Sequence, residues 1–338
     1  PAFNPSFSPA YAIFSFGAPH FNGMSQYGAY GRAKEGQSAE QILTAYYGDV
    51  EIKKDYDQNA NVCVGDSASN CQSMSVVEYA KRIYEVPNGW GNNGGMEALK
   101  AQAVAAKSYA LADMARKGFI CATESCQVYK PEPKGGNWET AVNETAGWVM
   151  VKNGKPFWSK YASTSGGYQR AYSDSGTGHT TPAFWDTKNG REGWTSDAFE
   201  KIGGSPWFYK AWYKTRSGDA CGRSHPWLTQ EEMADVLNGY IVLQSGSDDR
   251  VSPLGGCWSG NPYSMEELKN KANEKGGAVT SISSVEVNFG VNGRTSTVVF
   301  QTNKGSISVP GDQLYSVFNL RAPARISVKS GLFNVEMR

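Results

Sequence analysis

The stretch MEALKAQAVAAKSYALADMARK, residues 96–117, determines the core of the predicted fold. Its apolar residues recur at steps of three and four, the spacing of one helical face: Met96, Leu99, Ala103, Ala106, Ala110 and Met114. Gly118 follows the last turn and ends the helix. Because the centre is almost entirely alanine and small apolar residues, neighbouring backbones can approach it on more than one side. We therefore predict that this helix is the central, buried element of the fold.

Strand patterns dominate the sequence that follows this helix. Apolar residues 148–151 and 156–158 flank Asn153-Gly154, a pair that tolerates the positive φ of a tight hairpin turn. Polar and apolar residues alternate near the end of the chain, in segments 284–289, 295–301, 306–310 and 332–337. A helix over about 311–320 accompanies them. These features predict an α+β fold with β-hairpins and a small, mostly antiparallel sheet around the central helix.

Three capping boxes predict where further helices begin, because the side chains of the first and fourth residues satisfy free backbone amides. They are Ser38–Gln41, Thr229–Glu232 and Ser264–Glu267. The first fifteen residues, rich in Pro, Phe and Ser, are expected to form an extended arm on the body. We expect a motif-bearing core over 1–176, a Trp- and Gly-rich insertion or long loop region over 177–280, and a β-rich part over 281–338 that completes the core.

The composition excludes some classes of partner. With 338 residues and 40% hydrophobic content, the chain can form one large or two ordinary domains. Thirty-three basic and 32 acidic residues leave a charge of +1, so a nucleic-acid binder is not indicated. No apolar run reaches the roughly 20 residues that span a membrane. The opening residues resemble a processed secreted protein or a trimmed chain, and the 12% aromatic content suits either glycan binding or core packing.

Six cysteines fall into pairs, which indicates an oxidising, extracellular or cell-wall compartment. Neighbour pairing gives Cys63–Cys71, Cys121–Cys126 and Cys221–Cys257, although six cysteines allow fifteen connectivities. Zinc is the competing use of cysteine. The spacings differ from common zinc knuckles and no His lies beside them, so we predict neither a metal nor any other cofactor.

Three segments together resemble the SpoIID/LytB family of cell-wall proteins, named after sporulation stage II protein D. They are GMSQYGA at 23–29 with SAEQILTAYY at 38–47, EVP at 85–87 leading into EALKAQAVAAKSYA at 97–110, and YASTSGG at 161–167. The resemblance implies a SpoIID-like core and a secreted lytic transglycosylase that cleaves peptidoglycan glycan strands. The first segment leads here, whereas many members carry it near their end, so the motif order resembles a permuted arrangement.

The chain departs from the family pattern at several positions. Ala162 stands where some members have a zinc-binding His, and Pro19 and Phe21 replace the glycines that flank the family's counterpart of His20. The segment leading to Glu85 is about two residues shorter, and the Trp-rich stretch from about 177 to 280 matches no known pattern. The shorter segment would change the direction in which the Glu85 carboxyl points, and Ala162 predicts that the zinc of those members is absent here.

Glu85 is the candidate acid/base. Ordinary glycoside hydrolysis uses two carboxylates, but a lytic transglycosylase needs one, because the sugar's own C6 hydroxyl attacks the anomeric carbon from within the same molecule. Such a carboxyl needs a raised pKa, and the apolar neighbours Ile83, Val86 and Trp90 favour one. Glu97 is the rival, yet its place in the first turn of a helix with Lys100 three residues on is sufficient explanation.

The resemblance also implies substrate-binding residues: His20, Ser25, Gln26, Tyr27, Lys100, Gln102, Lys107, Ser163, Thr164, Ser165 and Gly166. Lys100 and Lys107 either orient Glu85 and bind glycan or are solvated and capping charges. His20 either lines the cleft or bonds within a turn. We expect the motif segments to line one groove with Glu85 at its floor.

Two other functions remain open at this stage. The scaffold could grip glycan or modify an amidase without cutting, with other cell-wall proteins as partners. Alternatively, a second carboxylate such as Asp174 or Asp186 would make an ordinary glycoside hydrolase. The products distinguish the three: 1,6-anhydro ends, reducing ends or unchanged strands.

Overall fold

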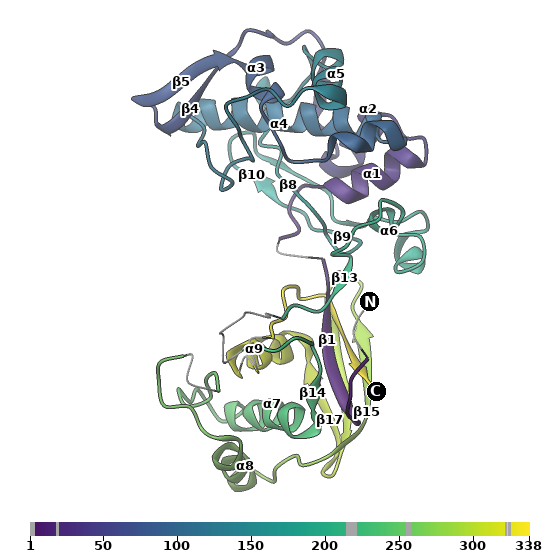
Figure 1. Cartoon of the computed structure of the whole chain (residues 1–338), viewed down its shortest axis with the longest axis vertical. Helices are drawn as coiled ribbons and strands as arrows, with labels where there is room; N and C mark the ends of the chain where they lie inside the picture. The colour runs from purple at the N-terminus through teal and green to yellow at the C-terminus, as the bar shows by residue number, and fades with distance from the viewer. Residues whose placement is uncertain (1–3, 18–19, 214–221, 255–257, 322, 324–325) are drawn as a thin grey trace. The chain divides into compact units, whose positions relative to one another are not determined.

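The computed structural model describes residues 4–17, 20–213, 222–254, 258–321, 323 and 326–338. These residues form a mixed α+β structure, which confirms the predicted fold class. Two compact units are present, His20–Phe208 and Pro1–Pro19 with Tyr209–Arg338 (Figure 1). Among the described residues, no helix combines the length and apolarity needed to cross a membrane.

This division differs from the predicted segments. The expected insertion over 177–280 is split between the two units. Residues 281–338 pack with strand β1 (Ala10–Phe16) and helix α7 (Gln230–Leu243) in a core of their own. Composition could not reveal the split, because a Gly- and Trp-rich stretch looks the same whichever unit it packs on.

Helix α4 (Met96–Lys117) is the buried centre of the His20–Phe208 unit, as predicted. Its alanines from Ala98 to Ala112 are buried, and it ends at Gly118, which has the left-handed φ of 78°. Four helices pack around it (Figure 1): α1 (Gln26–Lys34), α2 (Ala39–Tyr47), α3 (Val76–Lys81) and α5 (Gly136–Glu144). Small side chains allow this close approach.

Short strands and turns complete this unit. The predicted hairpin is confirmed as β6 (Val149–Lys152) and β7 (Lys155–Pro156), with positive φ at Asn153 and Gly154. The remaining strands are β2 (Met24–Ser25), β3 (Glu51–Lys53), β4 (Asn61–Ser67), β5 (Asn70–Ser75), β8 (Tyr161–Ala162), β9 (Tyr168–Gln169), β10 (Ser173–Asp174), β11 (His179–Thr180) and β12 (Phe184–Trp185). Helix α6 (Phe199–Ile202) and 3-10 turns at Asn88–Asn93 and Gly190–Gly193 lie between them.

Two disulfides are present in the same unit. Cys63–Cys71 closes the β4–β5 hairpin, and Cys121–Cys126 closes a loop after α4. Both are pairs expected from the spacing. Cys221 and Cys257, the third expected pair, lie outside the described residues.

The second unit is built on β1 (Ala10–Phe16), which is buried along its whole length. β1 pairs with β13 (Tyr209–Lys210), β14 (Leu228–Thr229) and, over Tyr11–Ser15, antiparallel with β18 (Phe333–Met337). The expectation of an extended surface arm is therefore wrong for residues 10–16. Their apolar side chains, with Tyr11 and Ile13 in the core, make this segment a sheet strand.

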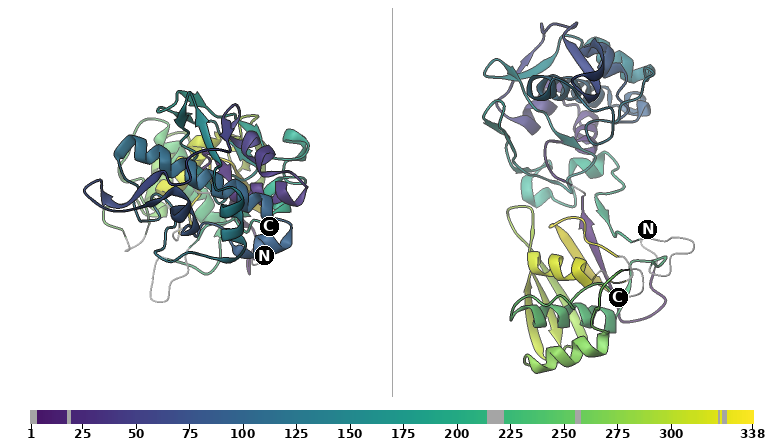
Figure 2. Two further views of the ribbon diagram at one scale, coloured as in Figure 1. Left: turned by 90° about the horizontal axis from the view of Figure 1, so that it is seen from above. Right: turned by 90° about the vertical axis from the view of Figure 1, so that its left-hand side faces the viewer.

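A three-stranded antiparallel sheet and three helices complete this unit. The strands are β15 (Ile282–Phe289), β16 (Thr295–Thr302) and β17 (Gly305–Pro310), and the helices are α7 (Gln230–Leu243), α8 (Met265–Glu274) and α9 (Gly311–Arg321). The helices lie on one side of the strands (Figure 2). α2, α7 and α8 each begin with the predicted capping box.

Candidate functional site

The His20–Phe208 unit contains an open pocket of about 540 Å³, within the size range of ligand sites. It is lined by His20, Asn22, Gln26, Glu85, Tyr109, Glu124, Ser125, Cys126, Lys160, Tyr161, Ala162 and Ser163. The lining residues come from all three motif segments and from the Cys121–Cys126 loop. The tyrosine rings offer flat faces for sugar C–H surfaces, and the polar side chains offer donors and acceptors.

Glu85 is half-buried in this pocket, and its Oε1 accepts two hydrogen bonds. The backbone N–H of Val128 donates to its Oε1 at 2.8 Å, and the hydroxyl of Tyr161 donates to the same atom at 3.3 Å. The side chain of Gln26 lies in the same pocket and lowers the pKa of the carboxyl. Tyr161 and Gln26 belong to strands and helices far from Glu85 in sequence, so the fold assembles the environment of this carboxyl.

Burial raises the pKa of Glu85 above its ordinary value, because desolvation disfavours the charged form. The donors Val128, Gln26 and Tyr161 act in the opposite direction, and the nearby Glu124 carboxylate adds to the rise. The net effect is upward. A carboxyl of this kind can hold a proton closer to neutral pH and still release it, as a general acid/base must.

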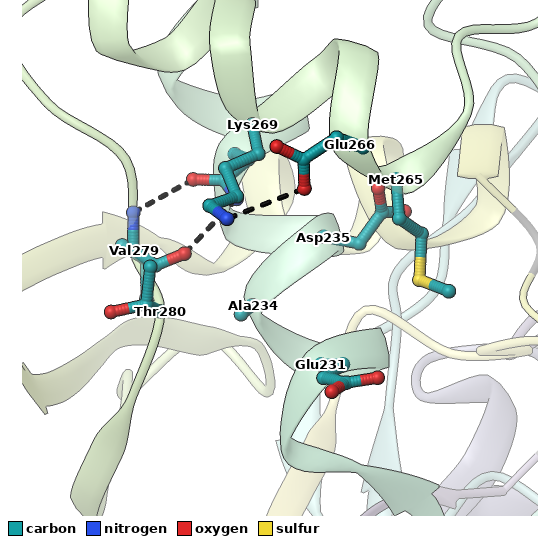
Figure 3. A pocket seen from close by; sticks show the side chains of 9 residues that line it. Glu231, Ala234, Asp235, Met265, Glu266, Lys269, Val279 and Thr280 are labelled. Atoms are coloured by element: carbon teal, nitrogen blue, oxygen red, sulfur yellow. Dashed lines mark hydrogen bonds and ion pairs between the residues drawn. The ribbon is translucent and has the colours of Figure 1, made fainter.

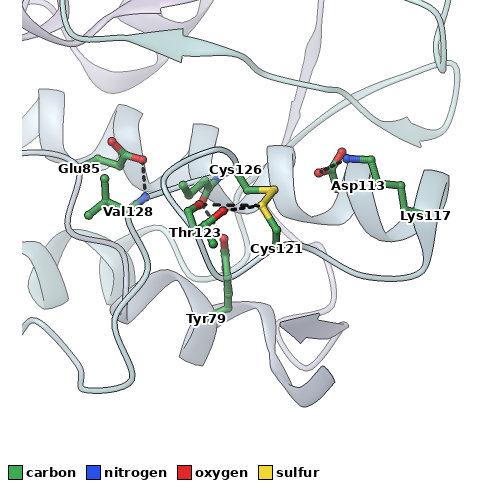
Figure 4. The surroundings of a disulfide bond; sticks show 9 residues. Tyr79, Glu85, Asp113, Lys117, Cys121, Thr123, Cys126 and Val128 are labelled. Atoms are coloured by element: carbon green, nitrogen blue, oxygen red, sulfur yellow. Dashed lines mark hydrogen bonds and ion pairs between the residues drawn. A yellow bond between two sulfur atoms is a disulfide. The ribbon is translucent and has the colours of Figure 1, made fainter. Parts of the chain in front are cut away.

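The Cys121–Cys126 disulfide supports this arrangement (Figure 4). Glu124, Ser125 and Cys126 of its loop line the pocket, and Val128, which follows the loop, donates to Glu85. The segment is held further by an N–H donated from Tyr84 to the carbonyl of Val128 at 2.7 Å. The cross-link therefore constrains both a wall of the pocket and a hydrogen-bond donor of its central carboxyl.

Two lysines give the site positive charge. Lys134 donates to the carbonyl of Val86, next to Glu85; burial lowers the pKa of Lys134 to about 8, while the charge of Glu85 opposes that shift. Lys160 lies in the pocket with its ammonium 4.1 Å from the ring centroid of Trp158. Within the part of the chain that the structure describes, the Lys160 ammonium forms no hydrogen bond or ion pair, so it is available to an anionic group.

Four of the residues predicted from sequence lie together in the pocket: Glu85, Gln26, Ser163 and His20, the last of these exposed to solvent. Tyr27 lies beside them, where its ring packs edge-on against Trp90 and its N–H donates to the carbonyl of Ser163 at 3.2 Å.

The other predicted hydroxyl and glycine positions do not face the pocket. Ser25, Thr164, Ser165 and Gly166 are buried, and all four donate to the carboxylate of Glu200 in α6. Their polar groups are thus used inside the protein. The sequence does not predict a role for Glu200. This residue lies in the stretch over 177–280 that we expected to be an insertion, and no neighbouring motif includes it.

The predicted residues of α4 are also placed elsewhere. Lys100 is paired with Glu97 at 2.7 Å and with Glu144 at 2.8 Å. Lys107 is fully buried and donates to the carbonyls of Thr145 and, at 3.1 Å, Ala146, and burial lowers its pKa to about 7. These ammonium groups hold α5 and the chain after it against α4. Gln102 is buried without a hydrogen-bond partner among the described residues.

The rival carboxylates are committed to structural contacts. Glu97 accepts the N–H of Ala39 at 2.8 Å, at the start of α2, besides pairing with Lys100. Asp174 is buried and accepts from the hydroxyl of Thr177 at 2.8 Å. Asp186 is buried in an ion pair with Arg32 at 2.7 Å. Of the acidic residues weighed from sequence, Glu85 alone lines the pocket; Glu124, on the exposed loop, was not foreseen.

Tyr109, Lys160 and Tyr161 were also missed as lining residues. Tyr161 opens the YASTSGG segment, so that motif carried a usable signal. Tyr109 lies on the exposed edge of an otherwise buried helix, and Glu124 and Ser125 reach the pocket only through the disulfide loop. No local pattern predicts that Glu124 and Ser125 line a pocket. Tyr109 lies within the motif of residues 97–110, but the motif does not show that its side chain faces the pocket.

A second pocket, of about 370 Å³, lies in the unit formed by 209–338 (Figure 3). Its polar lining groups bond one another: Asn238 bonds both backbone groups of Val279, and Lys269 pairs with Glu266 at 3.3 Å. Asp235 pairs with Arg321. In neither pocket, nor elsewhere among the described residues, do three His, Cys, Asp or Glu side chains form a group that could hold a metal ion.

Comparison with known proteins agrees with the motif segments. Residues 65–151 match the SpoIID family, described as "Stage II sporulation protein". A segment of 112 residues is 34% identical to the "Amidase enhancer" of Bacillus subtilis (strain 168). That alignment covers 32% of this chain and 16% of the relative, so the chain spans a small part of the length of the relative it matches. No solved structure matches the chain.

Proposed function

The chain belongs to the SpoIID family, and from that premise we propose that it is an extracellular, cell-wall protein that cleaves peptidoglycan glycan strands as a lytic transglycosylase. The observation that carries the proposal is the partly buried carboxyl of Glu85, whose pKa is raised, in a pocket that motif residues help to line. The two local disulfides and the cell-wall family support the extracellular location.

In the proposed reaction, protonated Glu85 gives its proton to the glycosidic oxygen as the bond from that oxygen to C1 breaks. The C6 hydroxyl of the same sugar attacks C1, and the Glu85 carboxylate takes the hydroxyl proton, which closes a 1,6-anhydro ring and restores the acid. Between these steps the carboxylate is ionised, and Val128, Tyr161 and Gln26 supply the donors that stabilise it. In this proposal the Lys160 ammonium, which lines the same pocket, binds a carboxylate of the muramyl residue.

The test is product analysis on purified glycan strands. Glu85→Gln keeps the shape of the side chain but cannot deliver a proton, so we expect loss of 1,6-anhydro products with glycan binding retained. Glu124→Gln is the matched control, because Glu124 lines the same pocket from an exposed loop. If the protein is a lytic transglycosylase, the Glu124→Gln variant still forms 1,6-anhydro products. Loss of cleavage in both variants, with reducing ends in the parent, would instead favour a two-carboxylate hydrolase.

A second candidate is a non-cutting role, in which the pocket grips glycan and the protein modifies an amidase. The printed name of the Bacillus subtilis relative, "Amidase enhancer", favours it. Unchanged strands after incubation with the parent protein, together with a higher rate of a cell-wall amidase in its presence, would support this role over cleavage.

A further inference from the structure

Glu200 is a buried carboxylate that binds two of the motif segments at once. It is 0% exposed and accepts five hydrogen bonds. The hydroxyl of Ser25 donates to Oε1 at 2.5 Å and that of Ser165 to Oε1 at 2.8 Å, while the N–H of Gly166 donates to Oε2 at 2.9 Å. Thr164, through its hydroxyl, and the N–H of Ser165 donate the other two.

Five donors around one carboxyl favour its ionised form. Burial raises the pKa of Glu200 above its ordinary value, and the bonds from Ser25, Thr164 and Ser165 oppose that rise without cancelling it. A buried carboxylate that lost these donors would carry a large desolvation cost, so the five bonds form as a unit. The segments around residues 25 and 165 are therefore both held by the carboxylate of Glu200.

Residues next to the donors of Glu200 form the surroundings of Glu85. Ser25 caps helix α1 through the N–H of Gly28 at 3.1 Å, and the next residue, Gln26, lines the pocket with Glu85 and lowers its pKa. On the other segment, Tyr161 donates to Glu85 and lies three residues before Thr164. Strands β2 and β8, which carry Ser25 and Tyr161, pair in parallel register. Movement of either segment would move a donor of Glu85.

Two glycines allow α6 to bring Glu200 to this point. A Cβ on Gly31 of α1 would lie 1.9 Å from the carbonyl oxygen of Phe199, and one on Gly203 would lie 2.2 Å from that of Tyr27. Both distances are far inside van der Waals contact, so the backbones of α1 and α6 touch where only glycine fits. The contact fixes α6, and with it Glu200, against the start of α1.

We propose that Glu200 is a positioning residue for the reaction at Glu85: by holding Ser25 and Thr164–Gly166 on one carboxylate, it keeps Gln26 and Tyr161 in contact with Glu85. Glu200 does not line the pocket. The inference rests on the proposed function for its activity readout, but its effect on the titration of Glu85 is independent of whether the protein cuts glycan.

The test is Glu200→Gln in the full chain, which keeps the side-chain shape but turns an N–H₂ group toward donors. Loosened bonds from Gln26 and Tyr161 should shift the titration of the Glu85 carboxyl to higher pH, measured by carbon-13 NMR with Glu85→Gln to assign the signal. Turnover on glycan strands should fall on the order of 100-fold, as for small misplacements of catalytic groups. Asp235→Asn is the control, since it removes another buried, paired carboxylate from the other unit and should leave the Glu85 titration unchanged.

The outcomes separate the two claims. An unchanged Glu85 titration in a folded Glu200→Gln protein would overturn the positioning role, whatever the activity. A shifted titration in a protein whose parent leaves glycan intact would support positioning and refute the proposed cleavage. If Glu200→Gln does not fold, Ser25→Ala removes a single donor and should shift the Glu85 titration in the same direction by less; no shift would again overturn the role.

Discussion

The Cys121–Cys126 disulfide offers a test of how the pocket is held together. Replacing both cysteines by serine opens a loop with a sequence separation of 5, for which loop-closure entropy predicts a stability loss of about 2 kcal/mol. The freed segment carries Val128, whose N–H donates to Glu85 at 2.8 Å. A hydrogen bond to a charged group contributes about 1.5–3 kcal/mol, so its full loss corresponds to a roughly 10- to 100-fold fall in turnover.

The Cys63–Cys71 disulfide provides the matched control. Its sequence separation of 8 predicts a similar loss of about 2.5 kcal/mol, but its hairpin contributes no residue to the pocket lining. Urea unfolding gives the stability of each double-serine variant, and release of 1,6-anhydro ends at a temperature where both are folded gives turnover. Equal turnover losses in the two variants would refute a specific link between the Cys121–Cys126 loop and Glu85.

Three further predictions concern stability and packing. Because burial raises the pKa of Glu85 above its ordinary 4.5, ionising it destabilises the fold as pH rises through that range; Glu85→Gln should therefore melt higher than the parent at neutral pH, with the difference vanishing near about pH 3. Gly31→Ala would place its Cβ 1.9 Å from the carbonyl oxygen of Phe199, so we expect a loss of at least about 1–3 kcal/mol in urea unfolding together with reduced turnover; unaltered turnover would contradict the α1–α6 contact. Arg321→Met leaves the Asp235 carboxylate buried without its partner and should destabilise the unit of residues 209–338 by about 3–5 kcal/mol in calorimetry, while the Glu85 titration stays unchanged.

Local patterns predicted many of the elements correctly. The alanine-rich repeat gave α4, Asn153-Gly154 gave the β6–β7 hairpin, and the capping boxes gave the starts of α2, α7 and α8. Each of these patterns involves residues that are close in sequence. Capping side chains bond nearby backbone amides, and turn residues adopt the backbone angles of the turn, whatever packs around them, so the sequence predicts these elements.

Contacts between distant segments could not be predicted in the same way. The sequence predicts a surface arm at β1. Residues 10–16 contain no signal that β18, from the other end of the chain, pairs with them. The motifs predict that the hydroxyls of Ser25, Thr164 and Ser165 bind sugar, since a sequence does not reveal the buried Glu200 to which they donate. Lys107 is predicted to line the substrate groove, yet its ammonium donates to backbone carbonyls in the core.

The pairing of β1 with β18 also determines how this unit would respond to force. Ala10 and Arg338 exchange backbone hydrogen bonds, of 2.7 and 2.9 Å, at one end of the ladder. Tension applied between these two points would load that first pair of bonds alone and then each following pair in turn, so the strands would unzip. Two strands that are pulled from opposite ends resist the force with all their hydrogen bonds at once. Residues 10 and 338 lie at the same end of this strand pair, so the bonds break one pair after another. A pull between residues 10 and 338 should therefore separate the ladder at low force, beginning at Ala10 and proceeding toward Ser15.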